Sequence, residues 1–442
     1  MNALKFPKIG SNTLPIFGNL VDLDSDLRHY NRMEAPVTYK RTLQRKIEEL
    51  NRYFPCIMLT GARQVGKSTL MRDMLPEGMN YITLDDYVEA EKAKEDPQGF
   101  LERYGLPLCI DEIQYAPELL RAIKMRVDAE RRPGMYWLTG SQRFHMMKGV
   151  TESLAGRIGV LELMSLSQRE MLGEGEEAQP FHPENAETLA KNGKVCDTTT
   201  LFERIWRGGY PQLIQYPHMP VRDYFNSYLQ TYVERDVQSL SQVGNKSAFV
   251  TLMRSAALRT GQQLVYNDLA RDAGVSPKTA AAWVSVLEAS GIVSLLQPYH
   301  SNSIKRLAKS PKLYFLDTGF CSWLAGCRDA AELARGPLAG AMLETWVYGQ
   351  LLRAFTNAGM EPRLYYFRNH DGAEVDFLIE DNMCLYPIEV KLSNRPVPGD
   401  LKGVRHIPAG LNKIHPGMVF CTSQKWEKLT PEGMAAFPIS AL

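Results

Sequence analysis

The chain has 442 residues, enough for about three domains, and its 44% hydrophobic and 23% charged residues are ordinary for a folded globular protein. A formal net charge of +1 excludes a global attraction to nucleic acid, so that any such binding must come from local basic patches. With no leader pattern, no bilayer-spanning apolar run and seven scattered cysteines, the sequence predicts a cytoplasmic protein with reduced thiols and no membrane partner.

Residues 1–37 contain Gly, Pro, Asn and Asp with little periodicity, which predicts an extended arm. A basic amphipathic helix is expected over 39–53 and a short buried strand over 56–59. After this strand, residues 61–68 match the phosphate-loop pattern G-x-x-x-x-G-K-[ST] at every fixed position. A chance match in a glycine turn is the alternative, but strand, loop and helical spacing follow in the order that nucleotide binding requires.

Each fixed residue of this loop has a chemical task. Gly61 and Gly66 let the backbone turn tightly, so that its N–H groups can point at phosphate oxygens. Lys67 can reach the β- and γ-phosphates, and the Ser68 hydroxyl can bind Mg²⁺. The predicted nucleotide-binding residues are Gly61, Ala62, Arg63, Gln64, Val65, Gly66, Lys67, Ser68 and Thr69, together with Asp111.

Two further strands are expected over 81–84 and 106–110, and the second is followed directly by Asp111 and Glu112. Because parallel strands end at one edge of a sheet, this acidic pair should lie beside the phosphate loop. Asp111 would then hold Mg²⁺, and Glu112 would orient or polarise the attacking water.

A fourth strand is expected over 135–139, and Ser141 lies just beyond it. This hydroxyl would sit between the two motifs and sense the γ-phosphate; a plain turn is the alternative. Arg157 would act as an arginine finger that reaches the nucleotide of a neighbouring subunit, or else be an ordinary surface arginine.

Polar residues over 173–200 predict a loop or linker, and a long amphipathic helix is expected over 224–240. Three charged residues in that helix are expected to form interdomain salt links, namely Glu234, Arg235 and Asp236.

The pattern over 264–296 is that of a winged helix, with one helix broken by Gly274, a second that begins at Ser276, and a strand. The second helix has Lys278 as its only cation and is rich in alanine, which is poor material for gripping phosphates or base edges. A basic stretch on the wing side predicts a phosphate track, made of Lys305, Arg306, Lys309 and Lys312. The alternative is a lid or protein-docking module with a solvated basic loop.

The last domain contains three expected strands, over 363–368, 373–379 and 385–392. Residues two apart on a strand share a face, so Glu389 lies beside Lys391, and Asp376 lies on the adjoining strand. Asp376 and Glu389 would bind Mg²⁺ and Lys391 would orient the nucleophile, with Glu344 of an upstream helix as a third carboxylate. A set of solvated ion pairs on the strand faces is the alternative.

From about residue 39 to its end, the chain resembles a prokaryotic family of AAA-type (AAA+) P-loop ATPases that join an ATPase core to a winged helix and a C-terminal domain of unknown function. The matching segments are 61–69, 110–114, 138–141, 154–157 and 232–236, with the Glu-Val-Asp-Phe and Ile-Glu-Val-Lys strands. The tail resembles the PD-(D/E)XK nuclease superfamily. Asp376 matches its Asp, Glu389 and Lys391 match its (D/E)-x-K, and Glu344 matches its helix Glu.

The expected fold is α/β. It consists of an arm (1–37), an AAA+ core (38–172), a linker and helical region (173–245), a winged helix (246–312) and a nuclease-like α/β domain (313–442). The resemblance implies an enzyme that hydrolyses ATP with Mg²⁺ and acts on DNA, including branched or repair intermediates, as a homo-oligomeric ring such as a hexamer. The second interpretation is a nucleotide-controlled switch or scaffold, whose nuclease-like domain only binds protein or nucleic acid.

Overall fold

The computed structural model describes residues 38–140, 153–178, 181–233, 245–299, 310–408, 410 and 412–442, and residues 39–442 form one compact unit. Several predictions lie outside the described residues. They are the arm at 1–37, Ser141, the salt links at 234–236, and the basic residues Lys305, Arg306 and Lys309.

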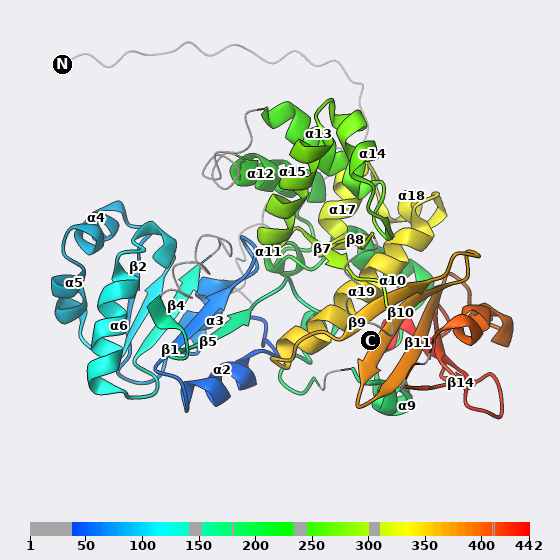
Figure 1. Cartoon of the computed structure of the whole chain (residues 1–442), viewed down its shortest axis with the longest axis horizontal. Coiled ribbons are helices and arrows are strands. Elements are labelled where there is room, and N and C mark those ends of the chain that lie inside the picture. Colours follow the sequence, from blue (N-terminus) through cyan, green and yellow to red (C-terminus); the bar gives the residue numbers. More distant parts are fainter. Residues whose placement is uncertain are drawn as a thin grey trace, which may run out of the picture. The chain divides into compact units, whose positions relative to one another are not determined.

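A five-stranded parallel sheet with the order β2-β3-β4-β1-β5 lies in the N-terminal part of this unit (Figure 1). Its strands are β1 (Cys56–Thr60), β2 (Asn80–Thr83), β3 (Leu108–Asp111), β4 (Tyr136–Gly140) and β5 (Ile158–Glu162). The helices of this region are α2 (Gln44–Asn51), α3 (Lys67–Asp73), α4 (Tyr87–Glu95), α5 (Pro97–Tyr104), η1 (Ile113–Tyr115) and α6 (Leu119–Glu130). The four strands expected from the sequence are confirmed with small shifts, whereas α2 is shorter than the helix expected over 39–53.

The inner strand β1 is buried along its whole length, because helices cover both faces of the sheet. Ile57 packs in one core cluster with Leu70 of α3. Its neighbour Met58 points to the opposite face and packs with Ile123 of α6. This alternation explains why the strand is an unbroken apolar run, and it places the loop after β1 at the carboxyl edge of the sheet.

A helical region follows the sheet. Its elements are α8 (Gln168–Met171), η2 (Pro183–Asn185), α9 (Ala186–Asn192), α10 (Thr198–Arg207), α11 (Pro211–Gln215) and α12 (Val221–Tyr232). The prediction of a loop over 173–200 is wrong for α9. Ala186 and Ala190 of α9 are buried, and the helix contacts β15 near the C-terminus. Tertiary packing therefore outweighs the polar composition of this segment.

Three helices and a small antiparallel sheet come next in the chain. They are α13 (Lys246–Ala257), α14 (Tyr266–Ala273), α15 (Pro277–Ala289), β6 (Gln262–Gln263), β7 (Val293–Leu296) and β8 (Lys312–Phe315), with the strand order β6-β8-β7. The expected break at Gly274 is confirmed, because this residue ends α14 in the left-handed conformation. The expected start of α15 is also confirmed, since the Ser276 hydroxyl accepts the Thr279 N–H at 3.1 Å.

The C-terminal part contains a mixed sheet with the order β14-β15-β13-β11-β10-β9, in which β12 also pairs with β11. Its strands are β9 (Leu364–Arg368), β10 (Glu374–Asp381), β11 (Cys384–Lys391), β12 (Lys413–Ile414), β13 (Met418–Cys421), β14 (Glu427–Lys428) and β15 (Ala435–Pro438). The helices are α17 (Thr318–Leu324), α18 (Ala330–Arg335), α19 (Ala339–Asn357), η4 (Pro398–His406) and η5 (Ile439–Ala441).

The long helix α19 links several regions, because it contacts β5 of the first sheet, β8 of the small sheet and β11 of the C-terminal sheet. The predicted meander of β9, β10 and β11 is confirmed as antiparallel. All seven cysteines are free thiols. Within the described ranges, no helix combines the length and apolar character needed to cross a membrane.

Candidate functional site

The phosphate loop lies between β1 and α3, and its two glycines are structurally required. A Cβ added at Gly61, where φ is 144°, would lie 2.1 Å from the Leu163 carbonyl oxygen. Gly66, with φ at 95°, is also in a region that L side chains rarely adopt. Lys67 is buried, and its amine donates to the carbonyl oxygens of Gly61 at 3.1 Å and Ala62 at 2.8 Å. The lysine therefore folds back over the loop.

The remaining loop residues differ in their surroundings. The Gln64 side chain accepts a hydrogen bond from the Tyr224 hydroxyl at 2.7 Å, which ties the loop to α12. The carbonyl oxygen of Val65 accepts from Arg41 at 2.9 Å. Thr69 is exposed on α3.

Asp111, the last residue of β3, lies where three elements converge on its carboxylate. One carboxylate oxygen accepts the Ser68 hydroxyl at 2.9 Å and also the Thr139 hydroxyl, and the other accepts the Tyr81 hydroxyl at 2.8 Å. The structure therefore brings Ser68 and Asp111 together. Burial, and then the hydrogen bond to Asp111, raise the pKa of the Tyr81 phenol.

Glu112 follows in a left-handed conformation, with φ at 59°, which is uncommon for a residue other than glycine. Its backbone N–H donates to the Thr139 hydroxyl at 3.0 Å, and its carboxylate accepts from the Gln114 side chain. Thr139 is fully buried, and its one hydroxyl group contacts both the Asp111 side chain and the Glu112 backbone.

Thr139 and Tyr81 did not emerge from the sequence. The signal for Thr139 is its position near the carboxyl end of β4, since β4 neighbours β3 and parallel strands end at the same edge of the sheet. That signal becomes readable only once the strand order is known.

Arg157 lies at the amino ends of the parallel strands, whereas the phosphate loop lies at their carboxyl ends. Its carbonyl oxygen accepts the N–H of Cys56, the first residue of β1, whereas the loop follows the last residue of that strand. Its guanidinium pairs with both carboxylate oxygens of Asp128 on α6, the longer contact being 3.1 Å. Arg157 therefore makes a partly exposed ion pair in this chain and is remote from the loop in the same chain.

A second polar cluster lies where α19, β8 and β10 meet. The Lys312 amine is 2.6 Å from a Glu374 carboxylate oxygen, 3.0 Å from one of Glu344 and 3.9 Å from one of Asp376. The Tyr314 hydroxyl also donates to Glu344. Burial and then the charge of Asp376 raise the pKa of the Glu344 carboxyl.

The other half of this cluster is on β11. Asp376 accepts the Val390 N–H at 2.8 Å, and Lys391 pairs with Glu389 at 3.0 Å. Burial and then the charge of Asp376 raise the pKa of the Glu389 carboxyl. Burial lowers the pKa of Lys391, but the charges of Glu389 and Asp376 outweigh it, so that this pKa is raised overall. The four residues expected from the sequence, Glu344, Asp376, Glu389 and Lys391, thus lie in one cluster.

Lys312 differs from its expected role. The sequence suggested an exposed cation on a phosphate track, but the residue is only 3% exposed and is enclosed by carboxylates. It belongs to β8, whose position beside α19 and β10 cannot be seen in the sequence. Among the described residues, no group of three or more His, Cys, Asp or Glu side chains is arranged as metal ligands.

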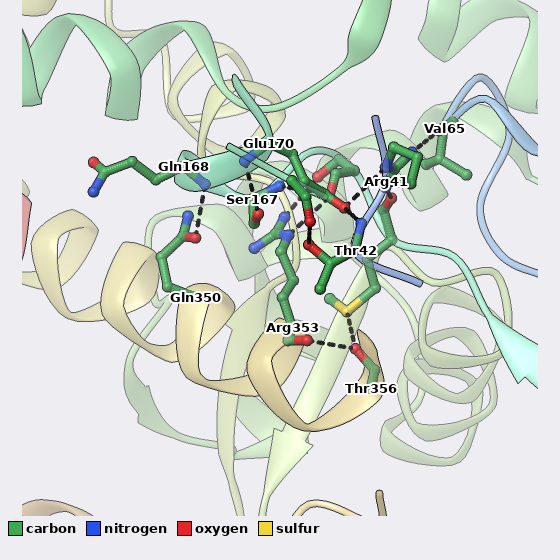
Figure 2. A network of polar contacts seen from close by, with 12 residues as sticks. Arg41, Thr42, Val65, Ser167, Gln168, Glu170, Gln350, Arg353 and Thr356 are labelled. Carbon is green, nitrogen blue, oxygen red and sulfur yellow. Dashed lines mark hydrogen bonds and ion pairs between the residues drawn. The ribbon is translucent and has the colours of Figure 1, made fainter. Parts of the chain in front are cut away.

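A buried polar network joins the phosphate loop to the segment after β5 (Figure 2). Arg41 donates to the carbonyl oxygens of Val65 at 2.9 Å and Met164 at 2.6 Å, and it pairs with Glu170 at 3.1 Å. Glu170 is fully buried and also accepts the N–H of Thr42 at 2.9 Å.

The same network continues into α19. Arg353 donates to the carbonyl oxygen and the hydroxyl of Ser165, at 2.9 and 2.6 Å, and Gln350 accepts the Gln168 N–H at 3.0 Å. Figure 2 shows the Gln350 and Arg353 side chains reaching from α19 toward the segment that contains Ser167, Gln168 and Glu170. Because α19 also carries Glu344, one helix contacts both the surroundings of the loop and the carboxylate cluster.

Comparison with protein families divides the chain into three matched regions. A family described as an AAA domain matches residues 53–172. Two domains of unknown function, DUF8612 and DUF4143, match residues 198–331 and 339–442.

Among solved structures, the chain is similar to the Walker-type ATPase PABY2304 of Pyrococcus abyssi, at 15% identity and a TM-score of 0.41, over 64% of this chain and 94% of that one. It is also similar to the Hsp104–ADP complex of S. cerevisiae, at 13% identity and a TM-score of 0.27, over 75% of this chain and 46% of that one.

Two mycobacterial proteins are similar over most of the chain. The uncharacterized protein Rv2008c of Mycobacterium tuberculosis is 30% identical over 378 residues, which are 83% of this chain and 75% of that protein. The uncharacterized protein Mb2031c of Mycobacterium bovis matches to the same extent. The chain therefore belongs to the family of these two proteins, and it contains an AAA-type P-loop ATPase domain.

Proposed function

We propose that the chain binds and hydrolyses ATP at the phosphate loop, with Mg²⁺ as cofactor. The observation that carries this proposal is the contact of 2.9 Å between the Ser68 hydroxyl and the Asp111 carboxylate, beside a phosphate loop that fits its pattern throughout. Hydroxyl and carboxylate oxygens are the ligands that Mg²⁺ prefers. Ser68 and Asp111 would hold this ion, which supplies charge neutralisation for the phosphates.

The protein groups around this pair have separate tasks in the proposed reaction. When ATP binds, the Lys67 amine leaves the carbonyl oxygens of Gly61 and Ala62 and contacts the β- and γ-phosphates, which are stronger partners for an ammonium group. Glu112 orients and polarises the attacking water. Thr139 positions both acidic residues, since its hydroxyl contacts the Asp111 side chain and the Glu112 backbone.

Two further residues would complete this site. Ser141, directly after β4, would sense the γ-phosphate. Arg157 would act on the nucleotide of a neighbouring subunit in a homo-oligomeric ring, because it lies at the edge of the sheet away from its own loop. In that ring it would exchange Asp128 for phosphate oxygens.

We propose further that this ATPase acts on DNA, including branched or repair intermediates. In this proposal residues 246–312 form a winged helix and 313–442 a PD-(D/E)XK nuclease-like domain, after a core at 38–172 and a helical region at 173–245. The closeness of Glu344, Asp376, Glu389 and Lys391 supports the nuclease-like assignment. Phosphates would be held by Lys305, Arg306 and Lys309.

The second candidate function is a nucleotide-controlled switch. It is favoured by a series of buried contacts. Arg41 donates to the carbonyl oxygens of Val65 and Met164, and Ser165, the residue after Met164, accepts from Arg353 on α19. The turn after α15 also lies against the loop, since a Cβ added at Gly291 would lie 3.5 Å from the Ala62 Cβ. A change in the loop on nucleotide binding would therefore reach α19 without any DNA.

The ATPase rate of the purified chain, with and without duplex, single-stranded and branched DNA, separates the two functions. Stimulation of the ATPase rate by one DNA form supports the proposal that this ATPase acts on DNA. An ATPase rate unaffected by all three, with no DNA bound, supports the switch. No hydrolysis and no ATP binding under any condition would contradict both.

A further inference from the structure

We propose that Lys312 is a built-in cation which occupies the carboxylate cluster of Glu344, Glu374 and Asp376 and so keeps divalent metal out of the C-terminal site. The proposal rests on the proposed nuclease-like site for Glu344 and Asp376, and Glu374 is added because it contacts Lys312. It differs from that site in one respect: the residues present do not fit a bound Mg²⁺ while β8 is in place.

The first support is the geometry of the lysine amine. It contacts Glu374 at 2.6 Å and Glu344 at 3.0 Å, with Asp376 at 3.9 Å. Carboxylate oxygens gathered around one positive centre are the surroundings that a hard divalent cation requires. The ammonium group therefore takes the space and satisfies the charge that such a cation would need.

The second support is the rigid anchoring of Lys312. It is the first residue of β8, and its backbone pairs with Gln263 of β6 on one side and Leu296 of β7 on the other. Its side chain is 4% exposed, and the amine lies 5.5 Å from the Tyr366 ring centroid. The cation thus reaches the carboxylates from a different sheet, and a displacement of β8 would withdraw it.

The third support is the local balance of charge. The neighbouring cations contact other carboxyl groups, since Arg368 lies 3.5 Å from Glu374 and Lys391 lies 3.0 Å from Glu389. If Lys312 lost its charge, Glu344 and Asp376 would have no ion pair at these distances among the described residues. Two partly buried carboxylates without an ion pair are unfavourable, and a divalent cation would relieve them.

The test is Mn²⁺ binding without nucleotide or DNA, measured by the electron paramagnetic resonance of free Mn²⁺. The parent chain of this experiment carries Asp111→Asn, so that the ATPase site does not contribute. Every variant carries the same substitution. We expect Lys312→Met to gain one Mn²⁺ site at least about tenfold tighter than any site of the parent. Adding Asp376→Asn to that variant should remove the new site, and Lys312→Arg, which keeps the charge, should not create it.

Two results would overturn the proposal. One is an Mn²⁺ site in the parent that Asp376→Asn removes, because metal and Lys312 would then coexist. The other is a folded Lys312→Met chain, with the parent's circular dichroism spectrum, that gains no site. Lys312→Gln serves as a second neutral variant if methionine prevents folding, and the parent measurement needs no variant at residue 312.

The readout separates this inference from the proposed function. A chain that cuts no DNA but gains the Mn²⁺ site on Lys312→Met leaves the metal inference standing and contradicts the nuclease activity. A chain that cuts DNA with Mg²⁺ while Lys312 is intact, and whose parent binds Mn²⁺ at Asp376, contradicts the metal inference alone.

Discussion

Glu170→Gln is the substitution that tests most sharply how the phosphate loop is held. Glu170 accepts three hydrogen bonds or ion-pair contacts: from Arg41 at 3.1 Å, from Thr42 at 2.9 Å and from Ser167 at 2.8 Å. The two charged side chains are 5% and 0% exposed. Glutamine keeps the shape of the side chain but removes its charge, and it presents one amide NH₂ where two oxygens accept.

The expected cost follows from burial. Removing one partner of a buried ion pair leaves an uncompensated charge, here on Arg41, and costs about 3–5 kcal/mol. The matched control is Glu49→Gln, which removes an ion pair with Lys46 of nearly the same length, 3.0 Å, where the glutamate is 56% exposed. An exposed pair contributes at most about 1 kcal/mol, so that the control should unfold like the parent.

The assay is unfolding in urea, followed by far-ultraviolet circular dichroism. Glu170→Gln should lower the midpoint clearly, and ATP affinity should fall with it because Arg41 no longer holds the Val65 carbonyl in place. If Glu170→Gln and Glu49→Gln unfolded at the same urea concentration, the buried network would not be supporting the loop, and the reasoning from burial would be refuted.

Three further predictions concern the two polar sites. Thr139→Val, which removes one hydroxyl at nearly constant volume, should lower ATP turnover by at least about tenfold, and unchanged turnover in a steady-state assay would count against its positioning role. Arg157→Ala should lower turnover without lowering ATP affinity, and mixing it with Lys67→Ala chains should restore some activity; failure of every mixture would argue against action between subunits. Because the pKa of the Glu389 carboxyl is raised in the folded chain, this carboxyl keeps its proton at pH values where the unfolded chain has already lost it. Stability should therefore fall as the pH rises from the ordinary carboxyl pKa to the raised pKa of the folded chain. Glu389→Gln should flatten this decline in a pH series of thermal unfolding, and an unchanged slope would contradict it.

Local chemistry was readable from the sequence. The loop glycines, the strand that ends in Asp111 and the helix break at Gly274 are each set by a few neighbouring residues, and the structure contains these elements where they were expected. The pairing of Asp376 with the Glu389 strand was also readable, because a short turn joins β10 to β11 and alternation along each strand fixes the faces.

Contacts between distant segments were not readable. Lys312 lies 32 residues before Glu344, and no local pattern distinguishes a lysine on an exposed wing from one buried against another sheet. The helix α9 was not predicted for the same reason. The burial of its two alanines depends on β15, which is much later in the chain. Tyr81 and Thr139 meet Asp111 only because the strand order puts β2 and β4 on either side of β3.

The most direct test of ATP hydrolysis at the phosphate loop is a paired measurement of ATP affinity and turnover in the parent, Glu112→Gln and Lys67→Ala chains. Glu112→Gln should bind ATP as the parent does and hydrolyse it at least about a hundredfold more slowly, because general-base assistance is lost. Lys67→Ala should lose tight ATP binding. Parent-like turnover in Glu112→Gln, or parent-like affinity in Lys67→Ala, would contradict the assignment of the site.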